Sequence, residues 1–251
     1  MTDLALAARG VSMRFGSFVA NDDVTLEVPV GQRRVLIGPN GAGKTTLFNV
    51  LAGQLRATKG SVELLGEDVT RTPAYRRARR GLARTFQLNN LFDELTVRQN
   101  VEITLASQSS SRNVFWRSLR SVPGIRDRSD ALLAEWEFTD FADLPVSELA
   151  YGQQRVMEIV LAMSTEPRVL LLDEPTAGLA PADAARLTRL VADLPRDITI
   201  VMIEHDMDVA FALADEVTVL HQGRVLAEGD PDAVAADPRV LQVYLGDMSD
   251  A

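Results

Sequence analysis

The segment GPNGAGKTT at residues 38–46, here called the phosphate loop, combines glycines with a lysine and two hydroxyl side chains. It follows an apolar run at residues 35–37 and leads into a helical pattern, so we expect a strand, a turn and a helix. Glycines let successive N–H groups point at phosphate oxygens, and a helix N-terminus favours an anion. Lys44 is a compact charge for the β- and γ-phosphates, and the Thr45 hydroxyl is a ligand for Mg²⁺. The predicted nucleotide-binding residues are Gly38, Pro39, Asn40, Gly41, Ala42, Gly43, Lys44, Thr45 and Thr46.

Two carboxylates follow the apolar run VLLL at residues 169–172, within RVLLLDEPT, and this run is typical of a strand buried on both faces of a parallel sheet. Ligands bind at the carboxyl ends of such strands, where Asp173 and Glu174 stand. We expect Asp173 to hold Mg²⁺ through water, and Glu174 to be the general base that polarises the attacking water.

A second apolar run, ITIVMI at residues 198–203, also ends in charged residues. His205 lies there between Glu204 and Asp206, and we interpret it as a contact to the γ-phosphate; a structural histidine is the alternative. The other histidine, His221, lies beside a Gln-Gly turn in a hairpin-like pattern and is interpreted as structural.

Composition limits the possible classes of protein. The chain has 251 residues and a formal net charge of −9, which argues against a protein that coats nucleic acid by bulk charge. It has no cysteine, so disulfides and thiolate metal sites are excluded. No apolar run reaches the roughly 18 residues that span a bilayer, and the N-terminus lacks the pattern of a signal peptide. We expect a soluble cytosolic protein with no nucleic-acid partner.

The order of the patterns predicts how the chain is organised. Residues 1–70 look rich in strands and would form, with residues 165–229, a sheet built around the phosphate loop. Residues 91–164 look mainly helical, and the tail reads as two short helices separated by Asp-Pro.

Two segments leave alternatives open. The basic cluster AYRRARRGLAR at residues 74–84 is either a solvated helix face or a surface near an anionic membrane or a permease. The segment at residues 107–124 mixes serine, arginine and aromatic residues, and it is either a variable exposed loop or a contact with a membrane partner.

Five motifs in this order resemble the ATP-binding subunit of ABC transporters: the phosphate loop, ARTFQ, LAYGQQR, LLLDEPTAGL and IEHD. The resemblance covers nearly the whole chain. It implies an α/β fold with a P-loop NTPase (RecA-like) core, an N-terminal antiparallel β subdomain and an inserted α-helical subdomain. The implied boundaries within a single nucleotide-binding domain (1–251) are 1–90 and 165–251 for the core, 91–164 for the helical subdomain and 230–251 for a C-terminal tail.

The resemblance also assigns roles to individual residues. Phe15 falls where an aromatic residue stacks on adenine. Gln87 falls where a glutamine contacts Mg²⁺ and links the nucleotide to the membrane partner. Asp173 and Glu174 match the second carboxylate motif of the family, and His205 matches its switch histidine.

LAYGQ at residues 149–153 lies where the family has its signature loop, which opens a helix facing the ATP held by the other subunit of a dimer. Gly152 would let the backbone approach the γ-phosphate, whose charge the helix dipole favours. Ala150 replaces the usual serine, Tyr151 the first glycine, and Ala180 an acidic or amide residue after the carboxylate motif. The phosphate loop and the carboxylate pair are intact, so hydrolysis is expected. The residues expected to contact the ATP in trans are Tyr151, Gly152 and Gln153.

LAYGQQR, IEHDMDV and the ending VYLGD look like the branched-chain amino-acid transporter branch, in which two different ATP-binding subunits often pair. The lipopolysaccharide-export ATPase is a near relative that the sequence leaves open. We predict an ATPase motor subunit that is peripheral at the cytoplasmic face of the inner membrane. Its expected partners are integral-membrane permease subunits, a second ATP-binding subunit and, indirectly, a periplasmic or surface solute-binding protein.

Two other functions remain as alternatives. The first is a soluble ATPase of DNA repair or of ribosomes, against which the acidic charge and the missing coiled-coil heptads count. The second is a nucleotide-binding regulator without turnover, against which the presence of Glu174 counts.

Overall fold

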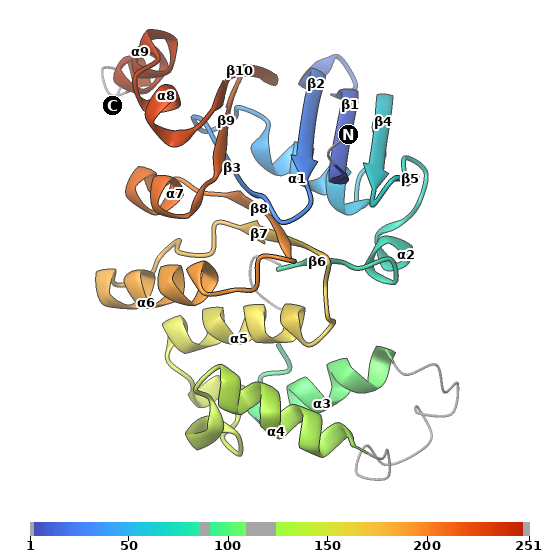
Figure 1. Cartoon of the computed structure of the whole chain (residues 1–251), viewed down its shortest axis with the longest axis vertical. Helices are drawn as coiled ribbons and strands as arrows, with labels where there is room; N and C mark the ends of the chain where they lie inside the picture. The colour runs from blue at the N-terminus through green and yellow to red at the C-terminus, as the bar shows by residue number, and fades with distance from the viewer. Residues whose placement is uncertain (1–2, 86–90, 109–123, 248–251) are drawn as a thin grey trace. The chain divides into compact units, whose positions relative to one another are not determined.

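The computed structural model describes residues 3–85, 91–108 and 124–247 (Figure 1). The chain divides into two compact units. The first holds residues 1–84, 168–178 and 185–251, and the second holds residues 85–167 and 179–184. The predictions for Gln87 and for most of the segment 107–124 lie outside the described residues.

A six-stranded sheet in the order β10-β9-β3-β8-β7-β6 forms one layer of the first unit. Its strands are β3 (Arg33–Ile37), β6 (Leu82–Arg84), β7 (Val169–Asp173), β8 (Thr199–Ile203), β9 (Glu216–His221) and β10 (Arg224–Gly229). Every pairing is parallel except that of β9 with β10. All residues of β3, β7 and β8 are buried, as the apolar runs predict for β7 and β8; in β3 the buried residues include Arg33 and Arg34. The loops that follow these three strands therefore emerge at one edge.

A four-stranded antiparallel sheet in the order β2-β1-β4-β5 forms a second layer of this unit. Its strands are β1 (Leu4–Phe15), β2 (Phe18–Pro29), β4 (Lys59–Leu64) and β5 (Glu67–Asp68). Gly16 and Gly66 lie at positive φ in the turns that join β1 to β2 and β4 to β5. The predicted antiparallel β subdomain is confirmed.

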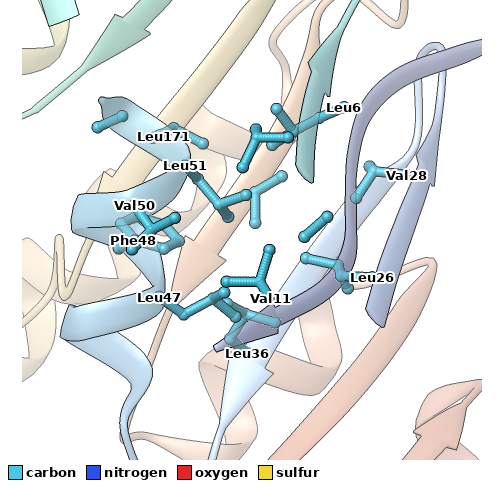
Figure 2. Packing of buried hydrophobic residues seen from close by; sticks show 14 of the residues in the cluster. Leu6, Val11, Leu26, Val28, Leu36, Leu47, Phe48, Val50, Leu51 and Leu171 are labelled. Carbon is cyan, nitrogen blue, oxygen red and sulfur yellow. The ribbon is translucent and has the colours of Figure 1, made fainter. Parts of the chain in front are cut away.

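Helix α1 (Lys44–Ala52) packs its apolar side chains into the core that the two sheets share. Figure 2 shows Leu47 and Leu51 of α1 lying toward the strands that carry Leu6, Val11 and Leu26. All five side chains are at most 1% exposed, and burying each contributes about 1.5–3 kcal/mol to folding. The helix that begins at the phosphate loop is thus held by the core.

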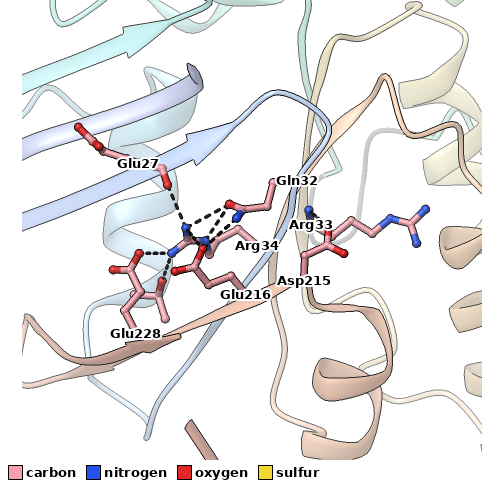
Figure 3. Close-up of polar contacts among 8 residues, drawn as sticks. Glu27, Gln32, Arg33, Arg34, Asp215, Glu216 and Glu228 are labelled. Atoms are coloured by element: carbon pink, nitrogen blue, oxygen red, sulfur yellow. Dashed lines mark hydrogen bonds and ion pairs between the residues drawn. The ribbon is translucent and has the colours of Figure 1, made fainter. Parts of the chain in front are cut away.

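A buried arginine on β3 ties this strand to β9 and β10 (Figure 3). Arg34 is 2% exposed; its guanidinium bonds Glu216 at 2.7 Å and also pairs with Glu228. It donates further to the Glu27 carbonyl at 2.9 Å and to the Gln32 side chain at 3.1 Å. Since one buried cation meets two carboxylates, its charge is compensated within the unit.

The basic cluster is only in part a solvated face. Its helix α2 spans Ala74–Ala78, and Arg77 on it is 1% exposed. The Arg77 guanidinium donates to the carbonyls of Val50 and Leu51 at the end of α1 and to that of Val69. Burial lowers the pKa of Arg77 to about 10, so the group stays charged at neutral pH. The prediction of a solvated helix face is therefore wrong for Arg77, which acts as a C-terminal cap of α1.

Four further helices complete the described chain of this unit: α6 (Pro181–Ala192), whose first turn belongs to the second unit, α7 (Met207–Leu213), α8 (Pro231–Ala235) and α9 (Pro238–Asp247). The break between α8 and α9 falls at Asp237-Pro238, as predicted for the tail. The hairpin of β9 and β10 turns at Gln222 and Gly223, both at positive φ, which confirms the expected Gln-Gly turn.

The second unit is mainly helical, as expected for its part of the chain. Its helices are α3 (Val97–Gln108), α4 (Ile125–Glu135) and α5 (Tyr151–Met163), with short 3₁₀ turns at Thr139–Phe141 and Val146–Glu148. Across residues 3–85, 91–108 and 124–247, none of the helices has the length and apolar character that a membrane crossing requires.

Candidate functional site

The phosphate loop joins the end of β3 to the start of α1, as the sequence predicts. Two of its glycines are required by close backbone approaches. At Gly38, with φ 145°, a Cβ would lie 2.1 Å from the carbonyl oxygen of Leu220. At Gly43, with φ 98°, a Cβ would lie 2.4 Å from the carbonyl oxygen of Ala20. Any larger residue would push the loop away from the neighbouring strands.

Lys44 is the buried cation of the loop. Its ammonium donates to the carbonyl oxygens of Gly38 at 2.5 Å and Pro39 at 3.0 Å. Burial lowers the pKa of Lys44, and the nearby carboxylates of Glu174 and Asp173 oppose this shift. The ammonium therefore lies inside the loop and within electrostatic reach of both carboxylates, where a phosphate can replace the carbonyls as its partner.

An open hollow of about 220 Å³ gathers most of the predicted residues of the first unit in one place. Phe18 lines it, and the predicted aromatic Phe15 does not, although both belong to the hairpin of β1 and β2. Phe15 is 48% exposed and Phe18 is 64% exposed. The residues that line the hollow are Phe18, Ala20, Asn40, Gly41, Ala42, Gly43, Lys44, Thr45, Thr46, Glu174 and His205.

Glu174 and His205 lie in contact at the edge of this hollow. The His205 Nε2 is 2.7 Å from the Glu174 Oε1. Glu174 has φ 48°, a left-handed conformation that costs a non-glycine residue on the order of 1 kcal/mol or more. Its backbone N–H donates to the Ile203 carbonyl at 3.0 Å, which holds this conformation in place. The strained turn aims the carboxylate at the histidine, a result that residue types alone do not predict.

Glu204 is a part of the site that the sequence reasoning missed. It is 2% exposed, and its carboxylate bridges the loops that follow β7 and β8. One oxygen accepts from the Thr176 hydroxyl at 2.5 Å and from the Thr176 N–H at 3.2 Å. The other accepts from the N–H groups of His205 at 2.9 Å and Asp206 at 3.4 Å. The available signal was a carboxylate at the end of an apolar strand, the same signal that identified Asp173.

Asp173 ends β7 and is 3% exposed, so its charge needs a partner. Arg84, at the end of β6, donates from Nη2 to the Asp173 Oδ2 at 2.8 Å. The neighbouring ammonium of Lys44 also lies within electrostatic range of this carboxylate.

The donors present fit Mg²⁺, a hard cation that prefers oxygen. Asp173 offers a carboxylate and Thr45 a hydroxyl at the start of α1. Among the residues that the structure describes, no three His, Cys, Asp or Glu side chains cluster as an all-protein metal site. Mg²⁺ usually takes only one or two carboxylates and completes its shell with water and substrate phosphates, so this sparse donor set suits it.

The predicted trans residues begin α5 in the second unit. Ala150 is the N-cap and has no side-chain hydrogen bond, but its N–H donates to the Gln153 Oε1 at 2.9 Å. A Cβ on Gly152 would lie 2.9 Å from the Asp183 Cγ and 3.0 Å from its Oδ2. Glycine at this position thus allows the first turn of α5 to approach Asp183.

Tyr151 is 40% exposed and rests on a buried arginine. The Arg155 Cζ lies 5.3 Å from the centre of the Tyr151 ring, and its Nε donates to the phenol oxygen at 3.1 Å. Arg155 also pairs with Glu158 at 3.1 Å, and burial raises the pKa of Glu158. Tyr151 is therefore held in place by a residue of its own helix.

Two family models match the chain. Residues 21–177 match the model described as ABC transporter, and residues 224–249 match the model described as branched-chain amino acid ATP-binding cassette transporter.

Relatives and solved structures match nearly the full length. The chain is 40% identical to the high-affinity branched-chain amino acid transport ATP-binding protein BraF of Pseudomonas aeruginosa, over 96% of this chain and 98% of BraF. It is 38% identical to LivG of Escherichia coli strain K12, which has the same description, over 98% of this chain and 100% of LivG. A crystal structure of the ADP conformation of an ATP-binding cassette of an ABC transporter is similar with a TM-score of 0.87 and 31% identity, covering 98% of this chain and 100% of that one.

Proposed function

The chain belongs to the ABC transporter family of ATP-binding proteins and is an ATPase, and from that premise we propose that it drives the import of branched-chain or related amino acids. The observation that carries the proposal is the match at residues 224–249 to the branched-chain amino acid transporter model, together with full-length similarity to BraF and LivG. This match favours import over lipopolysaccharide export, the alternative that the sequence motifs leave open.

We propose that the phosphate loop and Lys44 hold the β- and γ-phosphates of ATP. The N–H groups at the start of α1 and the buried ammonium supply the positive potential. Thr45, Asp173 and Gln87 would hold Mg²⁺, which neutralises charge on the phosphates when bound. An aromatic residue of the β1–β2 hairpin would stack on the adenine. Phe18 is a candidate for this role beside Phe15, because it lines the hollow.

The proposed hydrolytic step uses Glu174 as the general base. A water attacks the γ-phosphorus and transfers a proton toward the Glu174 carboxylate, while the bond from this phosphorus to the β–γ bridging oxygen breaks. The products are ADP and inorganic phosphate. His205, 2.7 Å from Glu174, orients the carboxylate and reaches the γ-phosphate. Glu204 fixes the backbone on which His205 stands.

We propose that each ATP is completed by a second ATP-binding subunit, either a copy of this chain or a sister chain. Tyr151, Gly152 and Gln153 would contact the γ-phosphate bound by the other subunit, through the N-terminus of α5. Residues 91–164 would form the helical subdomain that faces the permease, and residues 1–90 and 165–251 the catalytic core.

The remaining partners follow from the transporter role. The chain would work at the cytoplasmic face of the inner membrane, bound to integral-membrane permease subunits, and a periplasmic or surface solute-binding protein would deliver the amino acid. No nucleic acid is expected as a partner, since the net charge is −9.

Uptake in the native host tests this proposal. A strain that lacks the gene should lose uptake of radiolabelled leucine, isoleucine or valine; the wild-type gene should restore it, and Glu174→Gln should not. Normal uptake of all three amino acids in the deletion strain would contradict the proposed cargo. Loss of lipopolysaccharide export in the same strain would favour the alternative.

A further inference from the structure

Arg84 belongs to the basic cluster, but its guanidinium donates to three side chains, one of which is the candidate metal ligand Asp173. Its Nη1 donates to the Asn49 Oδ1 at 2.6 Å and to the Gln54 Oε1 at 2.7 Å, while its Nη2 donates to the Asp173 Oδ2 at 2.8 Å. Its Cζ also lies 5.6 Å from the centre of the Phe48 ring. One guanidinium thus joins the end of β6, the C-terminal part of α1 and the carboxylate that ends β7.

These contacts fix the orientation of the Arg84 fork. The side chains of Arg84 and Asp173 are 8% and 2% exposed, so water competes little for either group. Hydrogen bonds hold both Nη1 and Nη2 of this planar guanidinium, and the Phe48 ring lies over one of its faces, so the side chain has few rotamers available. Its bond to Oδ2 therefore restricts the rotation of the Asp173 carboxylate. A lysine would keep the charge but could not reach all three oxygen partners in the same geometry.

The strand pairing of Arg84 also places its backbone close to Asp173. β6 pairs with β7 in parallel, and Arg84 lies opposite Leu171, which is two residues before Asp173. In the sequence Arg84 stands three residues before Gln87. The backbone of Arg84 is thus paired with the strand that ends in Asp173.

We propose that Arg84 is a positioning residue for the metal: it orients the Asp173 carboxylate and thereby sets how tightly the nucleotide site binds Mg²⁺. This inference rests on the proposed function, in which Asp173 is a metal ligand. Hydrogen-bond partners of metal-ligating groups typically change metal affinity by roughly 10–100-fold when they are removed.

The test measures metal binding without turnover. Mn²⁺ is titrated by electron paramagnetic resonance into the purified chain saturated with the non-hydrolysable ATP analogue AMPPNP. The affinity for AMPPNP is measured separately in EDTA. Arg84→Gln and Arg84→Lys should both weaken Mn²⁺ binding roughly 10–100-fold, and neither should change AMPPNP affinity in EDTA. Gln54→Ala, which removes one exposed anchor, should weaken Mn²⁺ binding in the same direction by less and keeps the test valid if the Arg84 variants fail to fold.

Arg34→Gln is the matched control, because Arg34 is another buried arginine paired with carboxylates but lies outside the metal site. It should lower the thermal midpoint and leave Mn²⁺ affinity unchanged, which separates positioning from general stability. Asp173→Asn is the reference variant and should bind Mn²⁺ weakly. If it does, wild-type Mn²⁺ affinity in the folded Arg84 variants would overturn the proposal. Where the Arg84 variants do not fold, wild-type affinity in Gln54→Ala would overturn it. Wild-type affinity in Asp173→Asn as well would instead overturn the metal site itself.

Discussion

Glu204→Gln is the sharpest test of the bridge between the loops that follow β7 and β8. It replaces one carboxylate oxygen by an NH₂ group and keeps the shape of the side chain. The carboxylate accepts from two donors on each oxygen, Thr176 on one side and the N–H groups of His205 and Asp206 on the other. A glutamine at position 204 keeps the most hydrogen bonds when its Nε2 faces Thr176, because the Thr176 hydroxyl can then accept a hydrogen bond from Nε2. The Thr176 N–H then faces the Nε2 donor in place of the carboxylate oxygen, which lies 3.2 Å from the Thr176 N in the wild type.

The expected loss follows from these contacts. An unsatisfied buried N–H costs about 1–3 kcal/mol, and loss of the charge on the remaining bonds adds about 1 kcal/mol. We expect the free energy of unfolding to fall by about 2–4 kcal/mol. ATP turnover should fall as well, since the bonds from the backbone N–H groups of His205 and Asp206 then end on a neutral amide oxygen and weaken.

Denaturant unfolding followed by circular dichroism measures this loss, with Thr176→Val as the partner variant. The Thr176 hydroxyl donates to a charged acceptor in the wild type and meets a neutral amide in Glu204→Gln. The double variant should therefore cost less than the sum of the single variants, by about 0.5–3 kcal/mol. A Glu204→Gln loss below about 0.5 kcal/mol, or strict additivity, would refute the bridging role.

Arg77→Met should lower the free energy of unfolding by about 3 kcal/mol or more, because the carbonyls of Val50, Leu51 and Val69 lose their donor; an unchanged urea midpoint would contradict the capping role. Gly152→Ala should cost about 1–3 kcal/mol through its contact with Asp183. The same change in an Asp183→Ala background should cost less, and equal costs in thermal unfolding would argue against the contact. Lys44→Ala should weaken ATP binding by about 100-fold, since it removes charge-assisted bonds worth roughly 3 kcal/mol; calorimetry that finds native affinity would disprove the phosphate-loop interpretation.

The sequence predicts those features that depend on local chemistry. The phosphate loop, the buried strands β7 and β8 and the Gln-Gly hairpin all follow from glycine placement, apolar runs and turn residues. Because the strands are parallel, their ends had to meet at one edge, which brings Glu174 and His205 together.

Features that depend on long-range packing could not be read in the same way. Arg77 and Arg84 look alike within a basic run, yet one caps α1 and the other holds Asp173. Their roles depend on carbonyls and carboxylates that are distant in the sequence. The left-handed turn at Glu174 is similarly imposed by a bond to Ile203, against the preference of the residue itself. Sequence patterns place an arginine near a strand but do not reveal what it contacts.

Steady-state ATP hydrolysis by the purified chain and by Glu174→Gln tests the central claim most directly. The Glu174→Gln chain should lose about 100-fold or more of its turnover, as expected for removal of a general base. It should still bind MgATP and, when sized by chromatography with MgATP, should form a dimer with itself or with a sister subunit. Unchanged turnover in Glu174→Gln would contradict the account, because the step assigned to this carboxylate would then proceed without it.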